Sequence, residues 1–121
     1  MSPKIVLLVD DDLAFLDGVG DRLRSWGLDV RTAATATVCY QALREELPDL
    51  VLLDIRLPDG DGLDILRDIR KQHPDLPVVM ASSLRGKKEE ALHAGARAFL
   101  AKPFGKEALR KEVFLALGEG I

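Results

Sequence analysis

Four short apolar runs in this chain each end in a side chain that could do chemistry. Carboxylates bind hard cations and attack phosphorus, while hydroxyl and ammonium groups donate hydrogen bonds to anionic oxygens. Brought together, such groups would form a site that accepts a phosphoryl group. The runs and the residues that follow them are 5–9 with Asp10, Asp11 and Asp12, 50–53 with Asp54, 78–81 with Ser82, and 98–101 with Lys102.

These runs have the length and composition of buried β-strands. A short apolar stretch bounded by turn-forming residues is typical of a strand covered on both faces, as in a parallel sheet under helices. A further stretch, 29–33, is more polar and predicts a strand nearer an edge of the sheet. The segment after Asp54 carries Pro58, Gly60 and Gly62, which indicates a turn-rich loop.

Between the strands, apolar residues recur at spacings of three and four, which predicts amphipathic helices. Asp12 caps the first, which stops at Gly27; Thr35 or Thr37 caps the second, which Pro48 closes. The third ends near 73–74, the fourth is short at 87–94, and the last runs from 106 to about 117. The expected apolar positions are Leu13, Leu16, Val19, Leu23 and Trp26 in the first helix, Val38, Ala42, Leu43 and Leu47 in the second, Leu63, Leu66 and Ile69 in the third, and Leu109, Val113 and Leu117 in the last.

Strand and helix alternate five times without a linker or an internal repeat. This pattern predicts a single α/β domain, residues 1–121, with a doubly wound parallel sheet and helices on both faces. Crossover helices between parallel strands place all the strand ends named above on one side, where open α/β sheets bind their ligands. We therefore expect Asp10, Asp11, Asp54, Ser82 and Lys102 to converge at that edge.

The expected cluster has a definite chemistry. Three carboxylates in close proximity repel one another, so at least one should have a raised pKa unless a cation neutralises them. Mg²⁺ suits carboxylate and carbonyl oxygens, and Lys102 adds a second positive charge. Asp54 could then attack phosphorus while Ser82 donates to a phosphoryl oxygen. The residues alone thus support acceptance of a phosphoryl group on Asp54.

Composition excludes several other classes of protein. The 121 residues are 47% hydrophobic and 31% charged, with a net charge of -3, so the surface does not favour direct binding of nucleic acid. Cys39 is the only cysteine, which rules out an intrachain disulfide and favours a reducing compartment, the cytoplasm. No apolar run approaches the ~20 residues of a membrane span, so no membrane partner is expected.

Four motifs together resemble the receiver domains of two-component response regulators along nearly the whole chain. They are LLVDDD at the start, DLVLLDIRLPDGDG in the middle, VVMASS at the fourth strand and GARAFLAKPF near the end. The resemblance implies a flavodoxin-like fold with strand order 2-1-3-4-5. It also implies a regulatory phosphoacceptor that catalyses only its own phosphorylation and slow dephosphorylation.

The resemblance further implies a role for each site residue. Asp54 would take a phosphoryl group from a histidine kinase, a phosphotransfer protein or a small phosphodonor, and Lys102 would contact that group. Mg²⁺ (or Mn²⁺) would be bound by Asp10, Asp11, Asp54 and the backbone carbonyl of Arg56. Ser82 and Phe99 would act as the switch. A downstream target or output domain would recognise the resulting change in the surface of the fourth helix, fifth strand and last helix. The chain would be a monomer or a phosphorylation-dependent dimer. The Lys102–Pro103 bond would be cis.

Two pairs of residues depart from the family pattern. Arg97 and Ala98 stand where one large subfamily carries the acidic residues of its dimer interface. Arg56 and Leu84 occupy the positions that tune hydrolysis of the acyl phosphate, and neither suits the orientation of a water molecule. We therefore expect a long-lived phosphoaspartate.

Two other functions compete with this interpretation. A Mg²⁺-dependent phosphohydrolase would also use Asp54 as its nucleophile, but it needs a second acid nearby, often two residues on, where this chain has Arg56. A flavin-binding module would need a phosphate loop after the first strand, where three aspartates would repel phosphate.

Overall fold

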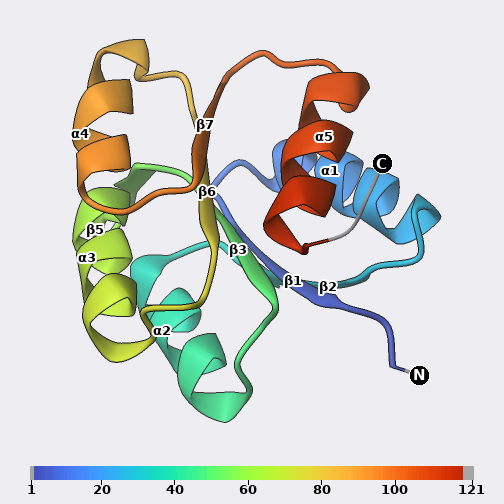
Figure 1. Ribbon diagram of the computed structural model, residues 1–121, viewed down its shortest axis with the longest axis horizontal. Coiled ribbons are helices and arrows are strands. Elements are labelled where there is room, and N and C mark those ends of the chain that lie inside the picture. The colour runs from blue at the N-terminus through green and yellow to red at the C-terminus, as the bar shows by residue number, and fades with distance from the viewer. Residues whose placement is uncertain (1, 119–121) are drawn as a thin grey trace.

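The protein is an α/β sandwich with strands and helices alternating along the chain (Figure 1). The structure is a computed structural model and describes residues 2–118. Its elements are β1 (Ile5–Val9), α1 (Leu13–Ser25), β2 (Asp29–Ala33), α2 (Ala36–Glu45), β3 (Leu50–Leu53), β4 (Arg56–Leu57), β5 (Gly60–Asp61), α3 (Gly62–Gln72), β6 (Val78–Ser82), the 3₁₀ turn η1 (Arg85–Lys87), α4 (Lys88–His93), β7 (Ala98–Ala101) and α5 (Lys106–Ala116).

The main sheet has five parallel strands in the order β2-β1-β3-β6-β7. Numbered within this sheet, that order is 2-1-3-4-5, so the predicted fold class and strand order are confirmed. The polar strand β2 lies at an edge, as its composition indicated. Strand β1 is central, with Val6 beside Val30 of β2 on one side and Leu50 of β3 on the other.

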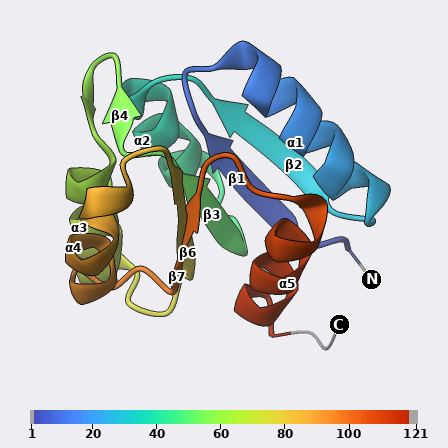
Figure 2. The same ribbon diagram turned by 90° about the horizontal axis from the view of Figure 1, so that it is seen from above.

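Helices cover both faces of the sheet. Figure 2 shows α1 and α5 on one face and α2, α3 and α4 on the other. Two buried apolar clusters result, because successive strand residues point to opposite faces. Leu7, Val51 and Met80 pack beneath α2–α4, whereas Leu8, Leu52 and Val79 pack beneath α1 and α5. Between Ser2 and Gly118, no helix has the length and apolar character to cross a bilayer.

Side-chain caps fix where three helices begin. The carboxylate of Asp12 accepts the N–H of Phe15 at the start of α1, and Thr35 caps α2 through the N–H of Val38. Asp61 caps α3 in the same way. The structure thus selects Thr35 over Thr37 as the cap of α2.

Several predicted apolar positions prove to be on the surface. Leu13 is 67% exposed and Val38 41% exposed, because each follows its helix cap closely and faces away from the sheet. Leu47 is 47% exposed and lies beyond α2, which ends at Glu45 before Pro48 is reached. Cys39, within α2, is fully buried instead. The fourth helix is shorter than the predicted 87–94, because residues 85–87 form a 3₁₀ turn.

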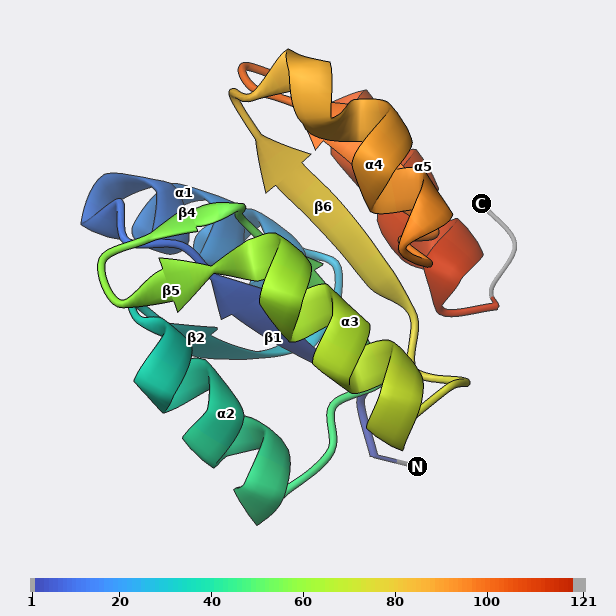
Figure 3. The same ribbon diagram turned by 90° about the vertical axis from the view of Figure 1, so that its left-hand side faces the viewer.

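The loop after β3 contains a small hairpin that the sequence did not reveal. Strands β4 and β5 pair antiparallel, and Figure 3 shows them beside the start of α2. At the tip, the carboxylate of Asp59 accepts the N–H of Ala36 at 2.7 Å and the N–H and hydroxyl of Thr37 at 3.0 and 2.6 Å. We call these three hydrogen bonds the Asp59 clasp. They fasten the hairpin to α2.

Candidate functional site

The carboxyl edge of the sheet gathers side chains from three separate strands. The ammonium nitrogen of Lys102, after β7, lies 2.5 Å from Oδ2 of Asp10, after β1, and 3.2 Å from Oδ2 of Asp54, after β3. Carboxylate oxygens of Asp10, Asp11 and Asp54 all lie within 4.8 Å of one another. The topology therefore brings together the acidic and basic residues that the sequence placed at strand ends.

The sheet itself holds these residues in place, because its hydrogen-bond ladder continues one residue past each strand. The N–H of Asp10 donates to the carbonyl of Ala33, and the N–H of Asp54 donates to that of Val9, both at 3.0 Å. The N–H of Lys102 likewise donates to the carbonyl of Ser82 at 3.0 Å. The backbones of the site residues are thus as fixed as the strands before them.

Asp10 is the buried acid of the cluster, with only 1% of its surface exposed. Burial raises the pKa of Asp10, and the hydrogen bonds from Lys102 and from the N–H of Asp12 oppose that effect. The negative charge of Asp54 also raises the pKa of Asp10, but it is the smallest of these effects. A raised pKa was expected in this cluster from repulsion between carboxylates, but loss of solvent is the dominant cause.

Lys102 is the cation that balances these carboxylates in the structure. Burial alone would lower the pKa of Lys102, but the hydrogen bond to Asp10 and the charges of Asp54 and Asp10 raise it overall. The ammonium group therefore stays charged at neutral pH. It is presented to the edge of the sheet with 21% of the side chain exposed.

The remaining predicted residues surround this centre. Ser82 is buried at the end of β6, and its Oγ accepts the N–H of Leu84 at 3.1 Å. Phe99 on β7 is half-buried and packs against the apolar cluster beneath α2–α4. Arg56 opens β4 with an exposed side chain. The Lys102–Pro103 peptide bond is cis.

Sequence reasoning missed one neighbour of the site, Phe15 in the first turn of α1. The ammonium nitrogen of Lys102 lies 4.1 Å from the centroid of the Phe15 ring. Phe15 lies four residues before Val19 and eight before Leu23, on the side of α1 that packs against the sheet, but an apolar pattern does not reveal a contact with a charged group of another segment. A possible signal was its position three residues after Asp12, where the helix begins beside the strand ends.

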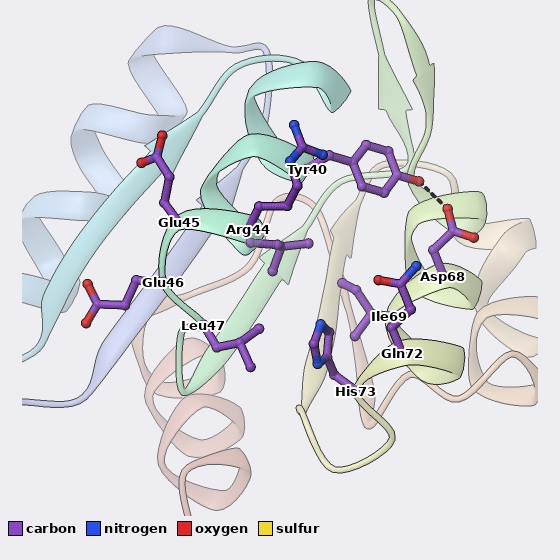
Figure 4. A pocket seen from close by; sticks show the side chains of 10 residues that line it. Tyr40, Arg44, Glu45, Glu46, Leu47, Asp68, Ile69, Gln72 and His73 are labelled. Atoms are coloured by element: carbon purple, nitrogen blue, oxygen red, sulfur yellow. Dashed lines mark hydrogen bonds between the residues drawn. The ribbon is translucent and has the colours of Figure 1, made fainter.

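A hollow lined by α2 and α3 lies away from this edge of the sheet. It measures about 710 Å³ and includes Leu43, Leu47 and Ile69, with the Tyr40 hydroxyl donating to Asp68 at 2.5 Å above it (Figure 4). Charged side chains also line it, among them Arg44, Glu45 and Glu46, but no ion pair between described residues joins two members of this lining. We therefore assign the candidate chemistry to the sheet edge, where the charged groups meet.

The acidic cluster suits a hard divalent cation. Carboxylate oxygens are the ligands that Mg²⁺ prefers, and the three aspartates offer one oxygen each at mutual distances that a single ion can bridge. Burial of Asp10 also makes its negative charge unfavourable without a partner cation. The residues present therefore fit such an ion.

Comparison with known proteins gives a consistent result. Residues 6–114 match the family model described as response regulator receiver domain. The chain is 36% identical over 108 residues to a probable transcriptional regulatory protein, TcrX, of Mycobacterium tuberculosis, covering 88% of this chain and 46% of that protein. It is 38% identical over 119 residues to the response regulator protein PilR of Pseudomonas aeruginosa, covering 97% and 27%.

Solved structures agree with this match. A CheY-like receiver domain protein from Methanospirillum hungatei superposes with a TM-score of 0.89 at 34% identity, covering 97% of this chain and 95% of that one. The receiver domain of NtrX from Brucella abortus gives 0.89 at 38% identity, covering 95% and 99%. The chain spans less than half the length of the curated relatives named above. This chain belongs to the response regulator receiver domains of two-component signalling.

Proposed function

We propose that this domain is a phosphorylation-controlled switch in which Asp54 accepts a phosphoryl group from a histidine kinase, a phosphotransfer protein or a small phosphodonor. The observation that carries the proposal is the bridge from Lys102 to both Asp10 and Asp54. A buried acid, an accessible carboxylate and a fixed ammonium are the groups that phosphoryl transfer to a carboxylate requires.

The geometry of Asp54 suits nucleophilic attack. Its Oδ1 accepts the N–H of Ile55 at 2.7 Å, which orients the carboxylate plane, and 12% of its side chain is open to solvent. An oxygen of Asp54 forms the new bond to phosphorus as the bond from phosphorus to the donor nitrogen or oxygen breaks. The electron pair leaves with the donor group.

Two further side chains would stabilise the transferred group. Lys102 needs only to exchange its contact with Oδ2 of Asp54 for a phosphoryl oxygen, since its ammonium already lies 3.2 Å away. The Ser82 oxygen accepts a hydrogen bond from the N–H of Leu84, which leaves its hydroxyl hydrogen to donate to another phosphoryl oxygen. The roles of both residues are part of the proposal.

Asp10, Asp11 and Asp54, together with the backbone carbonyl of Arg56, would hold Mg²⁺ or Mn²⁺. The ion supplies positive charge that offsets the carboxylates and the incoming phosphoryl oxygens. The three carboxylates and their spacing support this assignment.

Ser82 and Phe99 would convert the local charge change into a change of surface. Movement of Ser82 toward the phosphoryl group pulls on Leu84, because the two are hydrogen-bonded, and so displaces the segment that leads into α4. Phe99 on the adjacent strand would turn inward, and α4, β7 and α5 would present the altered face to a downstream target or output domain.

We place the protein in the cytoplasm, as a regulatory domain over residues 1–121 rather than a turnover enzyme. Arg56 and Leu84 offer no side chain suited to activating water beside Asp54, so the phosphoaspartate should be long-lived. Loss of the phosphoryl group as rapid as in the quickest chemotaxis-type receivers would contradict this expectation. Size-exclusion chromatography before and after phosphorylation would distinguish a constant monomer from a phosphorylation-dependent dimer.

The test is incubation with acetyl phosphate and Mg²⁺, read by intact mass. The wild-type chain should gain one phosphoryl group, and Asp54→Asn should gain none. Asp49→Asn is the matched control, because Asp49 lies at the opposite end of β3, where its carboxylate accepts the N–H of Ile5 at 2.7 Å. Phosphorylation of Asp54→Asn, or its loss in Asp49→Asn alone, would refute the assignment of Asp54.

A further inference from the structure

Phe15 lies against the ammonium group that the proposed function places at the phosphoryl group. The Lys102 nitrogen is 4.1 Å from the centroid of the Phe15 ring, well inside the range in which the negative face of an aromatic ring attracts a cation. The carboxylates of Asp10 and Asp54 contact the same nitrogen. The ammonium is therefore held between two acids and one ring.

The position of the ring is fixed from both sides. Asp12, the cap of α1, accepts the N–H of Phe15 at 3.2 Å, so the acidic run that lines the site also sets the backbone of Phe15. Phe104, two residues after Lys102, meets the Phe15 ring edge to face, with centroids 6.0 Å apart and planes at 85°. The backbone contact with Asp12 and the ring contact with Phe104 therefore hold the Phe15 ring in a defined position beside the site.

An aromatic face does something here that a carboxylate cannot. When the acids of the site bind a divalent cation and the phosphoryl group, they no longer balance Lys102 alone. A lysine side chain is flexible and strongly hydrated, so an ammonium that loses its partners tends to turn into solvent. The Phe15 ring attracts the ammonium without neutralising it and without competing for the metal ion.

The apolar surroundings strengthen that attraction. Only 21% of the Lys102 side chain is exposed, and the apolar side chains of Phe15, Val19, Pro103 and Phe104 line the hollow of about 470 Å³ beside it. Cation–π contacts gain strength as solvent is removed.

We propose that Phe15 is a positioning residue for phosphoryl transfer, whose ring face holds the Lys102 ammonium at the place where the phosphoryl oxygens arrive. The inference rests on the proposed function of Asp54 and extends it to a residue of α1. It concerns the electrostatics of the ring as well as its size.

The test replaces Phe15 by phenylalanines carrying one, two and three ring fluorines, which keep the shape of the ring while weakening its negative face. The rate of Asp54 phosphorylation by acetyl phosphate at saturating Mg²⁺ is measured by intact mass. We expect the logarithm of the rate to fall steadily with each fluorine, to a total loss of about three- to tenfold. Phe15→Leu, which keeps an apolar side chain without a ring, should lose a similar factor.

Phe114 provides the matched control. Arg110 lies over its ring at 5.6 Å, and Phe114 packs against Trp26 at the far end of α1. Trifluorophenylalanine at position 114 should leave the phosphorylation rate unchanged, and thermal unfolding should show that every variant is folded.

The outcomes separate the two proposals. A wild-type chain that gains no phosphoryl group overturns the proposed function. A wild-type chain that is phosphorylated, with a rate that fluorination at position 15 does not change, overturns the inference alone. Slow reaction of Phe15→Leu with a flat fluorine series also overturns it, because packing without cation attraction would then account for the effect.

Discussion

Gly62, the first residue of α3, has no room for a side chain, and its replacement by alanine should damage both the fold and the site. A Cβ at this position would lie 2.0 Å from the carbonyl oxygen of Asp54 and 2.9 Å from the Cα of Ile55. Both are backbone atoms, so no change of rotamer relieves the overlap. The N–H of Gly62 also donates to the carbonyl of Ile55 at 2.6 Å, which joins α3 to the loop that carries Asp54.

The size of the effect follows from these distances. Ordinary contact begins at 3.4 Å, so the Asp54 loop and the start of α3 must separate by well over an ångström. Overpacking of a close-packed region costs about 1–3 kcal/mol, and a weakened backbone hydrogen bond adds about 1 kcal/mol. We expect Gly62→Ala to lower the free energy of unfolding by about 2–4 kcal/mol, a large share of the roughly 5–15 kcal/mol of a typical domain.

Urea denaturation followed by the fluorescence of Trp26 measures the stability, and intact mass after acetyl phosphate treatment measures the site. Gly18→Ala is the matched control, because a Cβ at Gly18 in α1 meets none of the described atoms within 4 Å. It should stabilise the domain by up to about 1 kcal/mol, since alanine favours the helix. A Gly62→Ala variant within about 0.5 kcal/mol of wild type, phosphorylated at the wild-type rate, would refute the steric reasoning.

Two other substitutions and one titration test contacts away from the acidic cluster. The hydrogen bond from the Thr37 hydroxyl, and then those from the N–H groups of Thr37 and Ala36, lower the pKa of Asp59 below its ordinary value of 3.8. The Asp59 clasp therefore stabilises the fold above pH 3.8, and this stabilisation is lost as the pH falls through the pKa of Asp59 in the folded protein. Asp59→Asn should therefore be less stable than wild type at about pH 7, with a difference that narrows in urea titrations as the pH falls below 3.8. Burial, and then the hydrogen bond to Asp68 of α3, raises the pKa of Tyr40 above 10.0, so this hydrogen bond stabilises the fold below pH 10.0 and is lost as the tyrosine ionises at higher pH. Ultraviolet titration of this single tyrosine should show ionisation well above pH 10.0. A midpoint at or below 10.0 would count against the contact. Gly95 has φ +107° and a Cβ there would lie 2.5 Å from the Arg70 side chain, so Gly95→Ala should lose about 1–3 kcal/mol in thermal unfolding while Gly86→Ala, with open space among the described atoms, should not.

The parts of the molecule that sequence reasoning reached are those governed by local pattern. All five strands of the main sheet were located. Four are short apolar runs that end abruptly in a charged or hydroxyl residue, and the fifth, 29–33, is the more polar strand at the edge of the sheet. The parallel topology then required the strand ends to meet, and Lys102 does lie within hydrogen-bond distance of Asp10 and Asp54. A regular fold converts positions in the sequence into positions in space at this edge.

The contacts that escaped prediction are those between segments with no shared pattern. The Asp59 clasp joins residues more than twenty positions apart, and Asp59 in the sequence is one acid in a turn. The contact of Phe15 with Lys102 depends on how α1 is rotated about its axis. A shift of the helical pattern by one residue would turn Phe15 away from Lys102 and abolish the contact. The same uncertainty of phase explains why Leu13 was placed inside and is 67% exposed.

The anchoring of the helices is unequal, and this bears on how a switch would work. Side chains cap α1, α2 and α3, and the Asp59 clasp ties the loop beyond Asp54 to α2. Within residues 2–118, no side chain caps η1, α4 or α5. A charge change at Asp54 therefore meets a fixed structure on the side of α2 and α3. On the side of Ser82 it meets a 3₁₀ turn and a six-residue helix, which the Arg67–Glu90 ion pair at 2.9 Å joins to α3. Both side chains of this pair are about half exposed, and exposed ion pairs contribute little to stability. This inequality gives a physical reason for the proposed readout to pass through α4, β7 and α5.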